Sequence, residues 1–108
     1  MLPKQYRLTK NRDIRRVMQK GRKLSVPDVR LQYLIGNKLN HPRITVLVST
    51  KINKSAVKRN LLKRRIKSLL IEYINSNQTS VDVVITPFRE LEYSKIAPAI
   101  KELLSKVS

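Results

Sequence analysis

The sequence predicts a mixed α+β fold with the element order α-β-β-β-α-β-α. Two observations support this class: segments with apolar residues at helical spacing alternate with period-two or β-branched segments, and Gly, Pro and Asn separate them. With 108 residues, of which 41% are hydrophobic, the chain suits one domain with its own core. We therefore expect residues 1–108 to form a single domain without internal repeats.

A short helix is predicted at about residues 10–20. Ile14, Val17 and Met18 recur at helical spacing, Asp13 lies near the end that favours negative charge, and Gly21 follows the last turn. The other faces of this helix are mostly cationic, so its apolar stripe is narrow.

Three strands are predicted after this helix. Residues 24–26 form a short strand that Pro27 ends, residues 29–35 alternate between apolar and polar side chains, and residues 43–49 are rich in β-branched side chains. Because a short polar loop joins the last two strands, we expect them to pair as a hairpin.

A long amphipathic helix is predicted over residues 57–75, before a loop at 75–78. Its core-facing side chains fall within an arc of about 60°, with Leu70 at the margin. They are Leu62, Ile66, Leu69 and Tyr73. A different arc carries polar side chains, namely Asn60, Lys63, Arg64 and Lys67.

The last two elements are a strand over residues 81–86, ended by Pro87, and a helix that runs to about Lys106. Ile100, Leu103 and Leu104 are the apolar positions of this helix. Because a proline disfavours the α conformation of the residue before it, the helix either begins near Pro98 or is kinked there.

The net charge of +17 is unevenly distributed. Residues 1–71 hold 20 of the 24 basic residues, and no carboxylate lies between Asp28 and Glu72. Like charges repel in a folded domain unless a partner neutralises them. We therefore expect a polyanionic partner such as a nucleic acid.

The remaining composition excludes several classes of site. The chain has no cysteine and one histidine, His41, which excludes disulfides, thiolate metal sites and a histidine-based zinc site. No apolar run approaches the roughly 18 residues of a membrane span, and no signal-peptide pattern is present, so we expect a cytoplasmic protein without membrane contact. No cluster of acids or activated nucleophile predicts catalysis or metal binding by this chain.

The strongest functional signal is the segment from Lys51 to Lys67, which holds eight basic residues and no acidic one. A lysine-rich loop that opens a helix brings backbone N–H groups and cations to one place, as phosphate binding requires. The candidate RNA-binding residues are Lys51, Lys54, Lys58, Arg59, Asn60, Lys63, Arg64, Arg65 and Lys67. The alternative is a solvated cationic helix face without a ligand.

This segment resembles the signature of the bacterial ribonuclease P protein subunit family. The matching elements are Ser49 and Lys51, then Ala56-Val57, then Arg59-Asn60 and Lys63-Arg64. The resemblance extends from Arg7-Leu8-Thr9-Lys10 to the closing strand and helix. This chain departs from the family pattern at Thr50, Asn53 and Leu61, and it has Ile14 and Met18 where family members tend to place phenylalanines.

The resemblance implies a non-catalytic subunit of a ribonucleoprotein endonuclease that removes the 5′ leader of precursor tRNA. The catalytic RNA subunit would be the chief partner and would bind the Mg²⁺ ions, and no obligate protein partner is inferred. The implied fold is an α/β sandwich with a four-stranded sheet and a left-handed β-α-β crossover through the basic helix. General experience with parallel strands favours the right hand for such a crossover.

The resemblance also implies a shallow cleft between the first helix and the sheet that holds the single-stranded leader. Its candidate residues are Arg7, Arg12, Ile14, Val17, Met18, Val29, Leu31 and Tyr33. For the apolar members, ordinary core packing is the alternative.

Two rival classes share some of these features. A small ribosomal or other structural RNA-binding protein has the same size and charge, and a metal-dependent nuclease acting by itself is a more distant rival. The ribonuclease P hypothesis predicts that this protein stimulates leader removal by the RNA subunit at low Mg²⁺. Cleavage by the protein alone would favour the nuclease.

Overall fold

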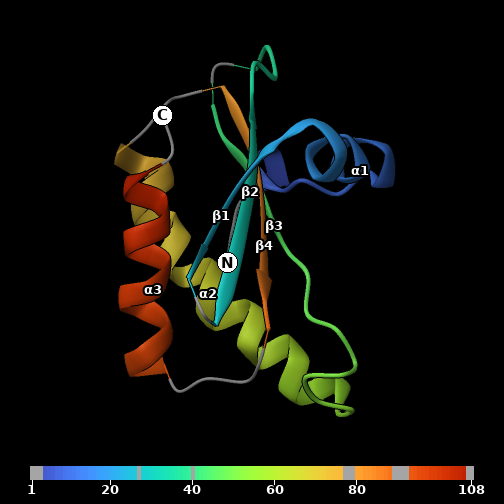
Figure 1. The fold of residues 1–108 in the computed structure, drawn as a ribbon, viewed down its shortest axis with the longest axis vertical. Helices are drawn as coiled ribbons and strands as arrows, with labels where there is room; N and C mark the ends of the chain where they lie inside the picture. The colour runs from blue at the N-terminus through green and yellow to red at the C-terminus, as the bar shows by residue number, and fades with distance from the viewer. Residues whose placement is uncertain (1–3, 27, 40, 77–79, 89–92, 107–108) are drawn as a thin grey trace.

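The computed structural model describes residues 4–26, 28–39, 41–76, 80–88 and 93–106 (Figure 1). In chain order the elements are the 3₁₀ helix η1 (Lys4–Tyr6), α1 (Asn11–Lys20), β1 (Arg22–Val26), β2 (Val29–Ile35), β3 (Arg43–Val46), α2 (Ala56–Ser76), β4 (Val81–Pro87) and α3 (Tyr93–Ser105). The predicted α+β class and the order of its helices and strands are confirmed. The short helix η1 was not expected.

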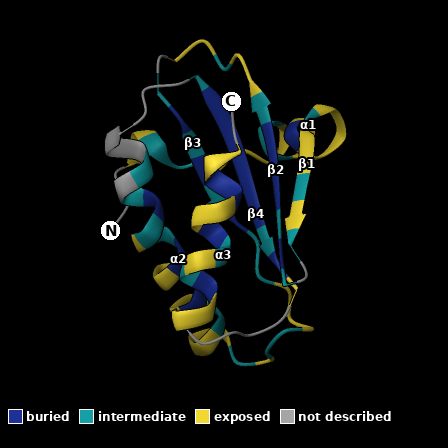
Figure 2. Cartoon of the chain, turned by 60° about the vertical axis from the view of Figure 1, so that its left-hand side comes forward, coloured by how far each residue is buried: buried dark blue, intermediate teal, exposed yellow. Residues whose placement is uncertain are grey.

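The four strands form one sheet in the order β1-β2-β4-β3. β2 pairs antiparallel with both β1 and β4, whereas β3 pairs with β4 in parallel. The expected hairpin between residues 29–35 and 43–49 is therefore wrong, because β4 lies between these two strands. β4 is buried along almost its whole length, so it takes the central position that helices cover on both faces (Figure 2).

The parallel neighbours β3 and β4 are joined through α2, which is the β-α-β crossover that the family resemblance implies. β3 ends at Val46, short of the expected end at Ser49, because the chain leaves the sheet there on its way to α2. One further backbone bond, from Leu47 N to Ile85 O at 2.9 Å, still ties this departing segment to β4. The left hand of the crossover stays a prediction.

Helices cover the sheet on both sides, with α2 and α3 against one face and α1 against the other (Figure 1). The larger core cluster lies under α2 and α3 and contains the fully buried Val29, Leu31 and Val83. A smaller cluster under α1 contains Leu8, Val17 and Val84. Alternate residues of the central strands β2 and β4 therefore serve different cores.

The core face of α2 is rotated slightly from the predicted one. Leu62, Ile66 and Leu70 are buried, whereas Leu69 and Tyr73 are only partly buried. The shift toward Leu70 follows from α3, which packs beside α2 in the same layer (Figure 2). α2 also continues to Ser76, and residues 77–79 of the predicted loop lie outside the described part of the chain.

α3 begins at Tyr93 and runs through Pro98. A start near Ala97 was the first alternative, and it is wrong. Pro98 is exposed, so its ring projects away from the core, while Ile96, Ile100 and Leu103 are buried against the sheet and α2. Packing on both sides of the proline offsets the cost of the one backbone hydrogen bond that proline cannot donate.

Candidate nucleic-acid interface

The loop after β3 is held in a defined conformation at the start of α2. The Ser55 hydroxyl accepts a hydrogen bond from Lys58 N at 3.3 Å, and the Asn53 side-chain oxygen accepts one from Ser55 N at 2.9 Å. Ser55 is therefore the N-cap of α2, a role typical of serine directly before a helix. This cap fixes the direction in which the loop lysines leave the helix.

Arg59 braces this loop from the first turn of α2. Its Nη1 donates to the backbone oxygens of Asn53 and Lys54, both at 2.9 Å. The sequence identified Arg59 as an RNA-binding cation. The structure gives it a second role, which is to position the segment that carries Lys51 and Lys54.

We expect Arg59→Lys to lower RNA affinity by about fivefold, which is about 1 kcal/mol, because lysine keeps the charge but cannot bridge both carbonyls. The slope of binding against salt concentration should stay unchanged, since no cation is lost. Fluorescence anisotropy with labelled RNA across a salt series measures both quantities. Arg65→Lys, a matched exchange on the exposed side of α2, should change neither. An affinity for Arg59→Lys equal to that of the unchanged protein would show that bracing of the loop by Arg59 does not contribute to RNA binding.

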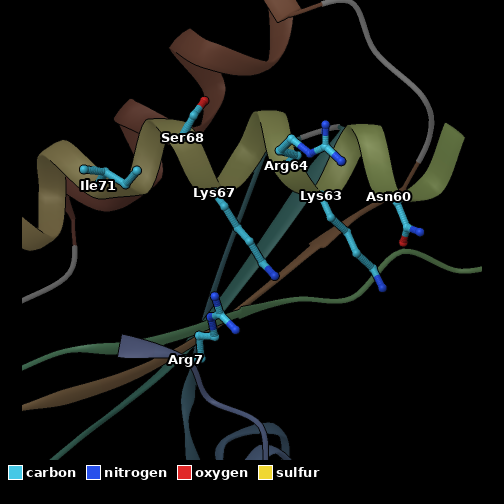
Figure 3. A pocket seen from close by; sticks show the side chains of 7 residues that line it. All are labelled: Arg7, Asn60, Lys63, Arg64, Lys67, Ser68 and Ile71. Carbon is cyan, nitrogen blue, oxygen red and sulfur yellow. The ribbon is translucent and has the colours of Figure 1, made fainter. Parts of the chain in front are cut away.

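A pocket of about 370 Å³ lies where α2 faces the N-terminal segment (Figure 3). Its lining consists of Arg7, Asn60, Lys63, Arg64, Lys67, Ser68 and Ile71. Lys63 and Lys67 extend from α2 toward Arg7, which lies beside the edge strand β3 through a bridge to Ile44. Two segments far apart in the sequence thus place cations around one space.

The cations of this pocket repel one another. Burial lowers the pKa of Lys67 below its ordinary value, and the nearby charges of Lys63 and Arg7 lower it further. An anion between these groups would relieve that repulsion and favour the charged form of Lys67. The charges of the pocket therefore favour the binding of phosphate groups.

The other predicted RNA-binding residues lie around this pocket or away from it. Lys51 and Lys54 are exposed on the loop before α2. Lys58 and Arg65 are exposed roughly 140° around the helix from the pocket side, at 100° per residue. The nine residues therefore do not share one surface: Asn60, Lys63, Arg64 and Lys67 line the pocket, whereas Lys58 and Arg65 lie on another side of α2.

Three of the residues predicted to line the leader cleft lie elsewhere in the structure. Val29, Leu31 and Tyr33 are 0%, 0% and 5% exposed and belong to the core under α2 and α3. They cannot line a cleft beside α1, because they point from β2 to the opposite face of the sheet. The sequence correctly predicted that these three side chains share one face of β2. It assigned α1 to that face, which α2 and α3 cover.

The two arginines of the predicted cleft also lie elsewhere. Arg7 lines the pocket on α2. Arg12 is exposed on the outer side of α1, where it borders a shallow hollow with other polar residues of that helix. The hollow faces away from the sheet, because Val17 on the opposite side of α1 is fully buried.

Three α1 residues of the predicted cleft do face the sheet or its border. Val17 is fully buried, and Ile14 packs partly buried against the same small cluster, so core packing accounts for both. Met18 is 42% exposed, and its backbone oxygen accepts a hydrogen bond from Gln32 of β2 at 3.3 Å. Met18 is thus the predicted apolar residue that remains available to a ligand on this face.

An ionic network that the sequence did not reveal fixes α1 to the sheet. Arg43 of β3 donates to both carboxylate oxygens of Asp82 on β4, at 2.9 and 2.8 Å, and to Asp13 of α1 at 3.3 Å. Asn37 donates to Asp82 as well, at 3.0 Å. The hydrogen bonds to Asp82 raise the pKa of Arg43 above its usual value, so the Arg43 guanidinium stays charged.

The donor groups in the described part of the chain do not fit a magnesium site. Mg²⁺ prefers carboxylate and water oxygens, and within the described residues no group of three or more His, Cys, Asp or Glu side chains is close enough to hold a metal. Asp13 and Asp82 come together on Arg43, whose guanidinium already binds both carboxylates.

The described part of the chain contains no helix that is both long and apolar enough to cross a membrane.

The sheet with helices on both faces, the capped basic helix and the cationic pocket define a small nucleic-acid-binding protein of the α+β class. A protein-family model described as Ribonuclease P matches residues 2–108. The ribonuclease P protein component of Pseudanabaena sp. is 28% identical, over 98% of this chain and 94% of its own length. That of Alkaliphilus metalliredigens is 32% identical, over 94% of this chain and 92% of its own length. The fold is similar to the RNase P protein of Staphylococcus aureus, with a TM-score of 0.83, 23% identity and 93% of each chain covered.

The chain belongs to the ribonuclease P protein family. Its function is therefore that of a ribonuclease P protein component, which binds RNA and takes part in tRNA processing while the RNA of the holoenzyme carries the catalysis.

Proposed function

We propose that this chain docks on the RNA subunit of ribonuclease P through the pocket of Arg7, Lys63 and Lys67 and the adjoining basic loop. The convergence of these cations from two segments is the observation that carries the proposal. Phosphates of a folded RNA would attract these cations and so relieve the repulsion among them. Arginine suits paired contacts to one phosphate, and lysine suits more diffuse neutralisation.

The substrate in this proposal is precursor tRNA, with its unpaired 5′ leader on the face of the sheet that α1 partly covers. Met18 supplies exposed apolar contact there. This face lies on the opposite side of the sheet from α2, so the leader and the RNA subunit would use separate surfaces. In this arrangement the protein holds the leader while the RNA subunit holds the body of the substrate.

The chemistry belongs to the RNA in this proposal. Mg²⁺ ions bound by the RNA subunit would supply the activated water for cleavage. The protein contributes cations that reduce the repulsion between two RNAs, so it should matter most when Mg²⁺ is scarce. We also propose that it acts in the cytoplasm, where bacterial precursor tRNA is processed.

Reconstitution with the matching RNA subunit tests this function. At low Mg²⁺ we expect the protein to increase the rate of leader removal from precursor tRNA by at least tenfold, read by gel separation of leader and mature tRNA. The RNA alone, the protein alone and an unrelated protein of similar charge are the controls. No stimulation, or equal stimulation by the unrelated protein, would refute the proposal, and cleavage by the protein alone would favour an independent nuclease.

A further inference from the structure

An exposed aromatic ring lies at the end of β4 on the same face of the sheet as α1. Phe88 is the single phenylalanine of the chain and is 45% exposed. The guanidinium carbon of Arg30 on β2 lies 5.0 Å from the centroid of its ring. This geometry is a cation–π contact, and it leaves a large part of the ring open to solvent.

Both side chains are carried by well-fixed backbone. Phe88 N donates to Asp28 O at 2.8 Å, which extends the β2–β4 pairing by one step beyond Pro87. Arg30 lies within β2, between Ser25 of β1 and Thr86 of β4. The backbone that carries the pair is therefore in place before any ligand arrives, which reduces the entropy cost of binding.

The pair is adjacent to the surface that α1 provides. Arg30 is two residues from Gln32, about 7 Å along the strand, and Gln32 contacts the backbone of Met18. Arg30 and Gln32 point to the same face, because alternate strand residues do so. A strand of RNA on this face could therefore touch Met18 and Phe88 with neighbouring nucleotides.

We propose that Phe88 and Arg30 form a stacking site for one unpaired base of single-stranded RNA. This inference rests on the proposed function, since that base would belong to the precursor leader. The guanidinium of Arg30 lies over the ring, and the part of the ring that stays exposed offers a stacking surface to any base. The same guanidinium can contact a phosphate of the bound RNA. The site should be tolerant of base identity, because every base has a π-face.

A tryptophan reporter tests the contact directly. The chain contains no tryptophan, so Phe88→Trp introduces a single fluorophore at the site. We expect a short unpaired RNA oligonucleotide of mixed sequence to quench its emission. Ile35→Trp is the matched control, because Ile35 is 50% exposed at the opposite end of β2. Equal quenching at both positions, or none at position 88, would overturn the proposal.

Affinity in the holoenzyme provides a second measurement. We expect Phe88→Leu, which keeps apolar bulk but removes the ring, to weaken binding of precursor tRNA about tenfold without affecting mature tRNA. Phe88→Tyr, which keeps the ring, should bind both as the unchanged chain does. Unchanged precursor affinity for Phe88→Leu, in a holoenzyme that the unchanged protein does stimulate, would refute the stacking site alone. Absence of stimulation by the unchanged protein would instead refute the proposed function.

Discussion

Replacing Lys63 and Lys67 together by alanine is expected to lower affinity for the RNA subunit roughly 30-fold at 0.1 M salt. Each cation that contacts a phosphate contributes about 0.7–0.9 to the slope of log affinity against log salt. The double variant should therefore bind with a slope about 1.4–1.8 smaller. Filter binding across a salt series measures the slope and the affinity together.

The same double variant should be at least as stable as the unchanged protein when no RNA is present. Burial depresses the pKa of Lys67, and the charges of Lys63 and Arg7 depress it further, so the free pocket contains desolvation and repulsion that the substitutions remove. Thermal melting in buffer without phosphate or sulfate checks this. A lower melting temperature would indicate that the loss of RNA affinity reflects damage to the fold.

A matched control separates the pocket from the total charge. Lys95 and Lys101 are exposed on α3, so their replacement by alanine removes the same two charges from a different surface. We expect this pair of substitutions to change RNA affinity less than threefold. If both double variants lost affinity equally, the overall charge of the protein, and not the Arg7–Lys63–Lys67 pocket, would account for binding.

The sequence predicted the features of this fold that depend on neighbouring residues. The strand over 29–35 was correct to the residue, because its alternation is a local signal. The polar arc predicted for α2 was correct as well, since Asn60, Lys63 and Lys67 share one side of any helix with 3.6 residues per turn, and all three line the pocket.

What the sequence could not supply is the pairing of distant segments. Nothing near residue 29 says which helix will cover Val29 and Leu31, so the apolar face of β2 was assigned to α1 instead of α2 and α3. Arg7 reaches the pocket only because its bridge to Ile44 places the N-terminal segment beside β3. Arg43 and Asp82 are 39 residues apart, and their ion pair exists only because β3 and β4 are neighbours.

The hydrogen bonds that Arg43 donates are expected to contribute strongly to the stability of the fold. Arg43→Met should destabilise the protein by about 3 kcal/mol, because Asp82, whose side chain is 9% exposed, loses both of its arginine bonds and keeps its charge. For a domain of this size that loss corresponds to a fall in melting temperature of about 12 °C or more. Urea unfolding followed by circular dichroism measures the free energy of unfolding.

Two further variants show whether the buried charge causes this loss. Asp13→Asn should cost only about 1 kcal/mol, because the Asp13 contact is longer, at 3.3 Å, and its side chain is 20% exposed. Adding Asp82→Leu to Arg43→Met should recover most of the lost stability, since a buried ion pair can often be replaced by apolar side chains, whereas one partner left alone is costly. If the combined variant were no more stable than Arg43→Met, the loss would arise from side-chain packing. Recovery would show that the Asp82 carboxylate, left without its cation, is the source of the loss. The charge of Arg43 then adds to the backbone pairing of β3 with β4 and, through Asp13, holds α1 against the sheet.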